Sequence, residues 1–126
     1  MSEAQNQPVF SIEKIVLRRE AFRGAVRLLF ESVDLIAVPA QAFAAPTLAR
    51  MGALGEDASL IAGLLRFTCP FDMTGSPTIT LPAGFAPNGG PVAFQFVGRH
   101  FDEAALVRAG DAFQRVTDWH TRHPAL

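Results

Sequence analysis

The segment Ala86-Pro-Asn-Gly-Gly90 constrains the fold more than any other part of the sequence. It separates two strand-like runs, Pro77 to Phe85 and Pro91 to Gly98. Asn88-Gly89 favours the positive backbone angles of a hairpin turn, so we expect two antiparallel neighbouring strands. Their register decides which side chains face inward, because a slip of one residue would expose the apolar row.

Upstream of this hairpin the sequence predicts helices and a third strand. Ser11 is placed to cap a helix of about five turns, because apolar residues recur at helical spacing from Ile12 to Val33. Asp34-Leu-Ile-Ala-Val-Pro39 is typical of a short buried strand closed by proline. After a loop with at most a turn or two of helix, Asp57 should cap a short helix that stops before Pro70.

A second long helix should begin after Asp102, which is placed to cap it. Phe101 and Leu106 then occupy the positions of a hydrophobic staple. Pro124 should end the helix. One face of this helix is expected to carry Leu106, Ala109, Gly110, Phe113, Val116 and His120.

These elements together predict an α/β fold. It has a small mixed or antiparallel three-stranded sheet, two long helices and one short helix. Residues 1–10 are polar and patternless, which is typical of a flexible tail. Residues 11–126 should form a single domain, because a chain of 126 residues has room for one hydrophobic core.

Composition and charge exclude several function classes. The formal net charge of −1, without a basic stripe, argues against nucleic acid as a partner. The sequence has neither a membrane-length apolar run nor a signal peptide at its polar start, so we expect a cytoplasmic protein that does not bind membranes. The single cysteine, Cys69, allows no internal disulfide.

The chain is unusually apolar for its length. Hydrophobic residues make up 49% of it before its 10 glycines are counted, whereas apolar residues and glycine together make up about 45–50% of ordinary domains. A short chain buries its surface inefficiently, so part of this apolar surface should be exposed or covered by a partner. We therefore expect either a homo-oligomer or a complex with another polypeptide.

Three stretches follow one another in a specific order and spacing: Phe67-Thr-Cys-Pro-Phe-Asp-Met-Thr-Gly-Ser-Pro-Thr-Ile-Thr-Leu-Pro-Ala-Gly84, Gly90-Pro-Val-Ala-Phe-Gln-Phe-Val-Gly98 and Phe101-Asp-Glu103. They resemble the C-terminal end of amidase-signature enzymes, and Asp34 to Pro39 is similar to the family's strand that follows a long helix. The chain departs from the family pattern at Asp72 where Asn is common, at Thr78 where Ala is common, and at Gly90 and Ala93 in place of Leu and Gly.

The resemblance implies a fragment of an amide hydrolase that contributes sheet and pocket wall. The family cleaves amides with a Ser, a second Ser in a cis peptide and a Lys, the serines lying in a Gly/Ser-rich loop. This chain has no Gly-Ser-Ser-Gly run, and its only lysine is Lys14 on a charged helix turn. We therefore expect no catalytic residue and no cofactor in this chain, and no amidase activity of the chain alone.

The partner implied by the resemblance is an N-terminal amidase piece, and a small amide would bind only to the completed enzyme. An alternative of a different class is a stand-alone interaction or structural module that does not catalyse and associates with itself. The two hypotheses share the expectation of covered apolar surface.

The resemblance also implies pocket-lining residues, because the segment before the family's Thr-x-Pro motif contributes to the substrate pocket. Here these residues are Arg66, Phe67 and Cys69. Family members that release ammonia from glutamine tend to have an acidic residue nearby, whereas this chain has Leu65 and Arg66, so glutamine is not favoured. Equally, Arg66 could merely end a helix.

Two arrangements of histidines are conceivable but not favoured. Cys69 could pair with His100, His120 or His123 as thiol and base, but a lone cysteine beside a proline is more typical of packing. His120 and His123 are three residues apart and could share a metal. Because no third ligand stands at an obvious spacing, we expect no metal site.

The remaining polar candidates are expected to be structural. Ser76 lacks the Gly-x-Ser-x-Gly context of an activated serine. Four carboxylates fit strand-end, turn and capping positions better than a paired acid and base: Asp34, Asp72, Asp102 and Glu103.

Overall fold

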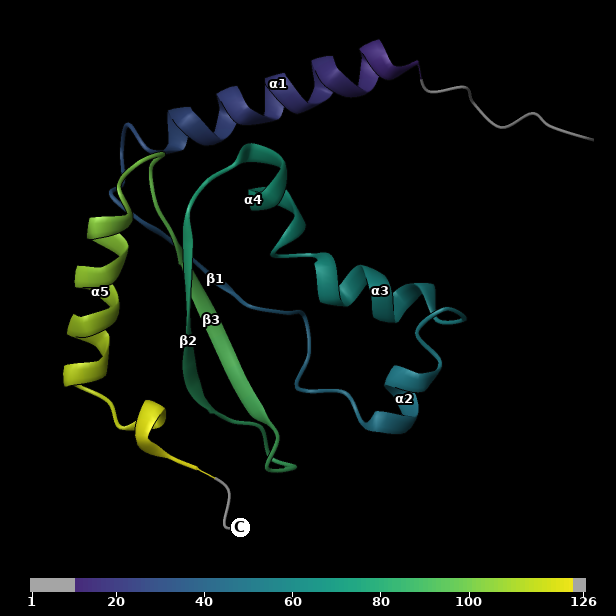
Figure 1. The fold of residues 1–126 in the computed structure, drawn as a ribbon, viewed down its shortest axis with the longest axis vertical. Coiled ribbons are helices and arrows are strands. Elements are labelled where there is room, and N and C mark those ends of the chain that lie inside the picture. Colours follow the sequence, from purple (N-terminus) through teal and green to yellow (C-terminus); the bar gives the residue numbers. More distant parts are fainter. Residues whose placement is uncertain (1–10, 124–126) are drawn as a thin grey trace, which may run out of the picture.

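A computed structural model of the protein describes residues 11–123. The expected tail at residues 1–10 and the helix-ending role of Pro124 lie outside these residues. Figure 1 shows α1 lying across one end of the sheet, α5 beside the sheet, and α2 and α3 forming an arm on the other side. The elements are α1 (Ile12–Leu29), β1 (Ile36–Pro39), α2 (Leu48–Gly52), α3 (Ala58–Leu65), α4 (Cys69–Thr74), β2 (Thr78–Phe85), β3 (Pro91–Val97), α5 (Glu103–Arg115) and a 3₁₀ turn, η1 (Trp119–Thr121).

The three strands form one antiparallel sheet in the order β1-β3-β2, which confirms the expected sheet and its hairpin. In the hairpin turn, the N–H of Gly89 donates to the carbonyl of Ala86 at 2.8 Å. Gly89 has a φ of 80°, whereas Asn88 has no positive φ. The turn is therefore centred on Pro87 and Asn88, one residue earlier than Asn88-Gly89 suggested.

Each edge strand has a proline whose backbone nitrogen lies on the unpaired edge of the sheet. The N–H of Ala40 donates to the carbonyl of Ala93 in β3 at 3.0 Å. Backbone groups of successive residues point to alternate sides of a strand, so the backbone nitrogen of Pro39 lies on the side of β1 that faces away from β3. On the other edge, the N–H of Gly98 donates to the carbonyl of Pro77 at 2.9 Å, which places Pro82 on the outer side of β2. Each outer edge therefore lacks one N–H donor.

Helices cover both faces of the sheet. On one face, Val97 of β3 is fully buried against Val26 and Phe30 from the end of α1. On the other face, the ring of Phe94 packs edge-on against Phe113 of α5, with centroids 4.9 Å apart. Successive residues of a strand point to opposite faces, so β3 contributes to both layers of the core.

The start of α5 differs from the sequence prediction. Phe101 is 95% exposed while Leu106 is 3% exposed, so the expected staple between them is absent. Phe101 also has a positive φ of 63°, which is uncommon for a residue other than glycine. Asp102 is the N-cap residue, but its side chain makes no capping hydrogen bond.

The end of α5 also comes earlier than expected. The helix ends at Arg115, and Val116 is 80% exposed instead of sharing the buried face. The hydroxyl of Thr117 donates to the carbonyl of Phe113 at 2.9 Å and so satisfies one of the last helical carbonyls. His120 lies in η1, beyond the helix on which it was expected.

Helix α2, five residues long, fits the turn or two of helix allowed in that loop, whereas α4 has no counterpart in the sequence prediction. The first turn of α4 contains Pro70, where a missing N–H costs nothing because that N–H has no partner inside a helix. Gly75 ends the helix in the left-handed conformation, with a φ of 72°. As expected, α3 stops well before Pro70, at Leu65.

The predicted starts of the other helices are confirmed. The side chain of Ser11 accepts a hydrogen bond from the N–H of Lys14 in α1, and that of Asp57 accepts from the N–H of Leu60 in α3. Arg19 joins α1 to α4, because its Nε donates to the carbonyl of Met73 at 2.8 Å. Within residues 11–123, no helix is both long and apolar enough to span a bilayer.

Candidate substrate-facing site

The three residues predicted to line a pocket lie on one short segment, residues 66–69, between α3 and the start of α4. A side chain from the sheet holds this segment. Gln95 of β3 is 3% exposed, and its Nε2 donates to the backbone carbonyl of Phe67 at 2.5 Å. The segment is therefore fixed against the sheet by a bond between residues 28 positions apart.

Strand alternation explains why Gln95 can reach Phe67. Its neighbours Phe94 and Phe96 point to the opposite face, where their rings pack edge-on at 4.9 Å. Gln95 therefore points toward the face that carries α4, beside its register partner Thr80. Sequence reasoning gave Gln95 no role, although an amide amid an apolar strand was the available signal.

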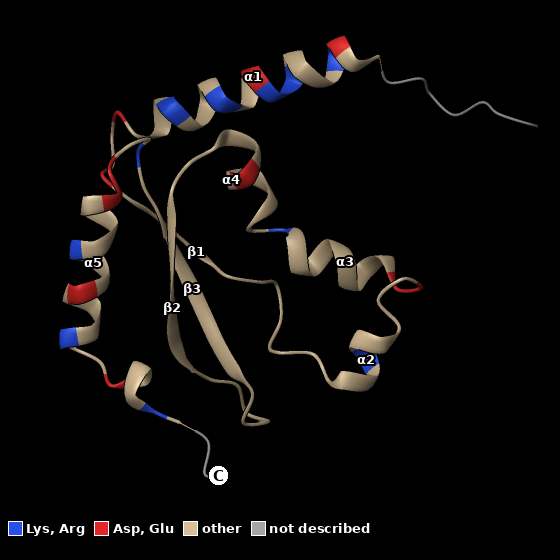
Figure 2. Cartoon of the chain, viewed as in Figure 1, with Lys and Arg blue, Asp and Glu red and all other residues tan. Residues whose placement is uncertain are grey.

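The segment presents three kinds of side chain. The guanidinium of Arg66 lies 5.8 Å from the centre of the Phe67 ring, and Cys69 is half-buried. Figure 2 shows the strands without charged residues, and the charges gather on the helices and loops. Because no described carboxylate pairs with Arg66, its positive charge is available to a polar or anionic group.

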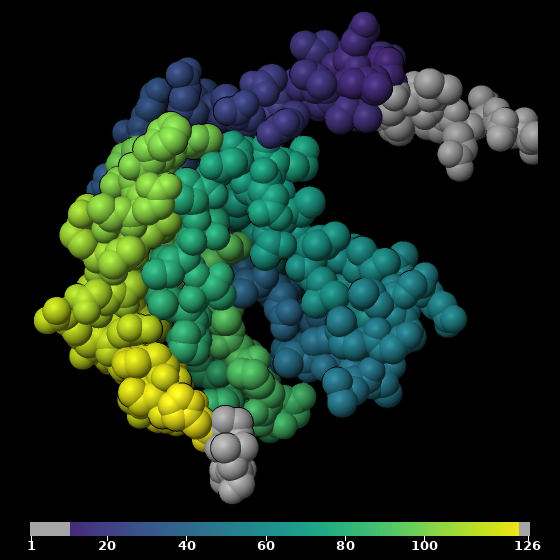
Figure 3. All heavy atoms as spheres, in the orientation of Figure 1, coloured from purple at the N-terminus to yellow at the C-terminus, as the bar shows by residue number. Residues whose placement is uncertain are grey.

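Two hollows lie near the sheet, and neither is lined by Arg66, Phe67 or Cys69. One, of about 400 Å³, separates the segment after β1 from the hairpin and includes Thr80 in its wall. Figure 3 shows the molecule hollowed between the sheet and the α2–α3 arm. The larger, of about 610 Å³, runs between α1 and the loops before β2 and after β3, including His100.

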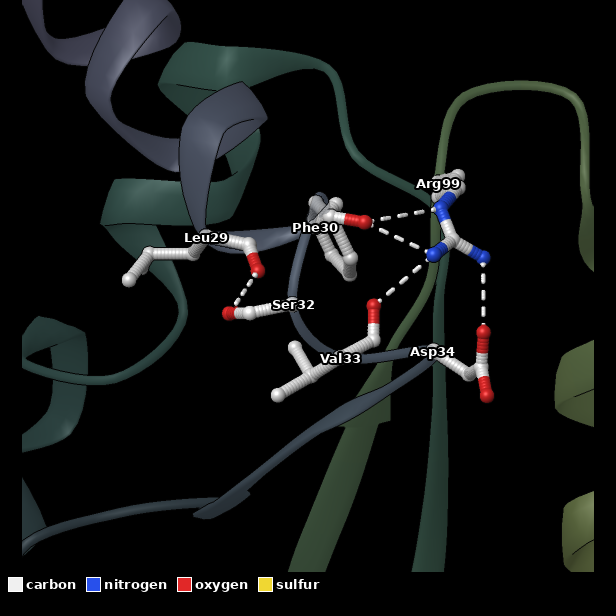
Figure 4. A network of polar contacts seen from close by, with 6 residues as sticks. All are labelled: Leu29, Phe30, Ser32, Val33, Asp34 and Arg99. Carbon is white, nitrogen blue, oxygen red and sulfur yellow. Dashed lines mark hydrogen bonds and ion pairs between the residues drawn. The ribbon is translucent and has the colours of Figure 1, made fainter.

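A polar network joins the end of α1 to the end of β3, as Figure 4 shows. Arg99 donates to the carbonyls of Phe30 at 2.7 Å and Val33 at 2.9 Å. It also donates to the carboxylate of Asp34 at 3.1 Å. The arginine thus satisfies carbonyls left free where α1 ends, and Asp34 belongs to this structural contact. Sequence reasoning did not identify Arg99.

The structure does not assemble the alternative thiol or metal sites. Within residues 11–123, no hydrogen bond joins Cys69 to His100, His120 or His123, and no group of three potential metal ligands occurs. The hydroxyl of Ser76 lies 2.8 Å from that of Thr74, a contact that orders the turn after α4.

The carboxylates with perturbed acidity also have local structural partners. Hydrogen bonds from the Ser59 hydroxyl and the Leu60 N–H hold the pKa of Asp57 below its usual value. The Arg122 guanidinium lowers the pKa of Asp118 in the same way. Both groups lie outside residues 66–69, so neither indicates acid–base chemistry at this segment.

Comparison with known proteins agrees with this architecture. The family model described as Amidase matches residues 2–107. Among curated proteins, "Putative amidase AmiD" of Mycobacterium tuberculosis is 48% identical over 109 residues, 86% of this chain and 23% of AmiD. A glutamyl-tRNA(Gln) amidotransferase subunit from Roseiflexus castenholzii is 44% identical over 111 residues, 86% of this chain and 21% of that protein.

Solved structures give the same result. A structure of 6-aminohexanoate cyclic dimer hydrolase complexed with substrate superposes with a TM-score of 0.74 at 25% identity, covering 86% of this chain and 25% of that one. The corresponding glutamyl-tRNA(Gln) amidotransferase subunit from Thermotoga maritima superposes with a TM-score of 0.63 at 26% identity, covering 76% and 20%. The chain spans about a quarter or less of the proteins it matches. It belongs to the amidase-signature family, as a fragment of that fold.

Proposed function

We propose that this chain forms one wall of an amide-binding pocket and part of the sheet of an amide hydrolase. The catalytic Ser, Ser and Lys would come from polypeptide outside this sequence. The observation that carries the proposal is the bond from Gln95 to the carbonyl of Phe67, because it fixes residues 66–69 on the sheet. A pocket wall needs such fixed geometry, since binding groups displaced by about 1 Å lose much of their effect.

The chemistry of the segment favours some amides over others. The Arg66 guanidinium, which no described carboxylate neutralises, disfavours a substrate with a positive charge near the scissile amide. The ring of Phe67 offers an apolar contact to an acyl chain. We therefore propose a neutral or anionic small amide, and glutamine, with its ammonium group, is not favoured.

Reconstitution tests this function. AmiD of M. tuberculosis lacking the 109 matched residues would be co-expressed with this chain, and hydrolysis of neutral, anionic and cationic small amides would be measured. The pair should hydrolyse amides and the chain alone should not. Arg66→Ala should raise KM for an anionic amide at least about fivefold and leave a neutral amide unchanged, whereas Arg108→Ala on the exposed side of α5 should change neither.

Two outcomes would overturn the proposal. One is turnover by the purified chain alone that survives repurification and is lost when a residue of this chain is changed. The other is a reconstituted enzyme whose KM values are the same for the Arg66 and Arg108 variants with every amide.

A second candidate role, self-association, is favoured by apolar side chains exposed on α1, such as Leu17 at 69% and Leu28 at 58%.

A further inference from the structure

One face of α1 carries mostly apolar side chains, with Arg19 among them, but is covered only at its C-terminal end. Val26 is 6% exposed, and Phe30, which follows the helix, is 7% exposed. Residues three, four and seven positions apart share a helical face, so this face continues through Phe22 and Ile15 to Ile12. Those three side chains are exposed by 37%, 51% and 79%, so the same face becomes more open toward the start of the helix.

The open half of α1 borders a bay. We use "the α1–α3 bay" for the space between the first half of α1, α4 and α3. In Figure 1 α1 extends past α4 above α3, and Figure 3 shows this space open in the space-filling view. The other two walls also carry exposed apolar side chains: Met73 of α4 at 41%, and Ile61 and Leu65 of α3 at 38% and 48%.

Two hydrogen bonds tie the walls of the bay to neighbouring parts of the fold. The bond from Arg19 to the carbonyl of Met73 ties the middle of α1 to α4. The bond from Gln95 to the carbonyl of Phe67 ties the segment after α3 to the sheet. A surface held in place before binding loses less conformational freedom on association, which favours a specific partner.

We infer that the α1–α3 bay docks the polypeptide that carries the remaining part of an amidase fold. The inference rests on the proposed function, and two observations name this occupant. The chain spans only 23% of AmiD, and it superposes at a TM-score of 0.74 on only 25% of the solved 6-aminohexanoate cyclic dimer hydrolase, so most of the fold of these relatives lies outside it. The bay also adjoins residues 66–69, so its occupant lies against the proposed pocket wall.

Matched substitutions on α1 test the docking surface. Ile15 lies on the face that lines the bay, and Leu17, 69% exposed, lies on the opposite side of the helix. Ile15→Glu and Leu17→Glu therefore add the same charge to the same helix at two different faces. Each variant would be co-expressed with tagged AmiD lacking its 109 matched residues, and the soluble complex recovered on the tag would be quantified against the wild-type chain.

We expect Ile15→Glu to lower the recovered complex at least about tenfold and Leu17→Glu to change it less than about twofold. Circular dichroism of each purified variant checks that α1 still forms. Three results would overturn the docking surface: no complex with the wild-type chain, equal losses for both variants, or a chain that pairs through Ile15 only with a second copy of itself. A complex that forms as expected but hydrolyses no amide would instead overturn the proposed function alone.

Discussion

Gln95 and Arg99 show how single polar side chains fix the irregular parts of this fold. Gln95 reaches from β3 to the carbonyl of Phe67, and Arg99 reaches from the end of β3 to the carbonyl of Phe30. Both partners are backbone carbonyls of residues far away in the sequence. The order of residue types does not reveal hydrogen bonds between positions so far apart. Sequence reasoning therefore identified residues 66–69 but not Gln95, whose side chain bonds to them.

Replacing Gln95 should weaken the fold measurably. In Gln95→Leu the carbonyl of Phe67 loses its hydrogen-bond donor, and an unsatisfied buried polar group costs about 1–3 kcal/mol. Urea unfolding monitored by circular dichroism should show this loss. Gln114→Leu in α5 is the control, because the Gln114 side chain makes no hydrogen bond to any residue in the range 11–123. Equal unfolding midpoints for the two variants would contradict the role given to Gln95.

The helices and strands with a strong periodic pattern were predicted from the sequence. Elements whose ends depend on one proline or one hydroxyl group were not. The hairpin and α1 follow from alternation and helical spacing with ordinary turn and capping residues. Helix α4 was missed because Pro70 signals an end to a helix everywhere except in its first turn. The end of α5 was placed too late because the hydroxyl of Thr117 bonds to the carbonyl of Phe113, a choice that apolar spacing does not reveal.

Two helical glycines should respond oppositely to alanine. A methyl group on Gly63 in α3 would overlap the Phe43 ring, which must move, so Gly63→Ala should destabilise the fold by about 1–3 kcal/mol. A methyl group on Gly24 in α1 meets nothing within 4 Å, so Gly24→Ala should stabilise by about 0.5–1 kcal/mol. Thermal unfolding of both variants compares them directly, and a stabilised Gly63→Ala would show that Phe43 does not pack there.

For the whole molecule, the excess of apolar residues predicted exposed apolar surface, and the structure places part of it on α1. The location could not be predicted, because the periodic face of α1 is the same whether or not another polypeptide covers it. Ile15, for example, has the spacing of a core residue and is 51% exposed. That residues 66–69 line a substrate pocket stays a prediction, since neither hollow beside the sheet is lined by Arg66, Phe67 or Cys69.

The chain alone should associate at micromolar concentration, because exposed apolar faces of this kind are normally covered in soluble proteins. Multi-angle light scattering should give a mass above the 13.6 kDa of one chain. Co-expression with AmiD lacking its matched residues should replace this self-association with a complex of the two polypeptides. A stable monomer that stays soluble over the same concentrations would contradict the prediction.

The prolines on the two outer edges of the sheet limit how far association through these edges can extend. A strand that joined β1 or β2 would find no donor at Pro39 or Pro82, so its ladder would be interrupted within a few residues. Amyloid growth requires uninterrupted backbone pairing from one molecule to the next. The protein can therefore expose two sheet edges and much apolar surface while offering fibrils no continuous strand on which to grow.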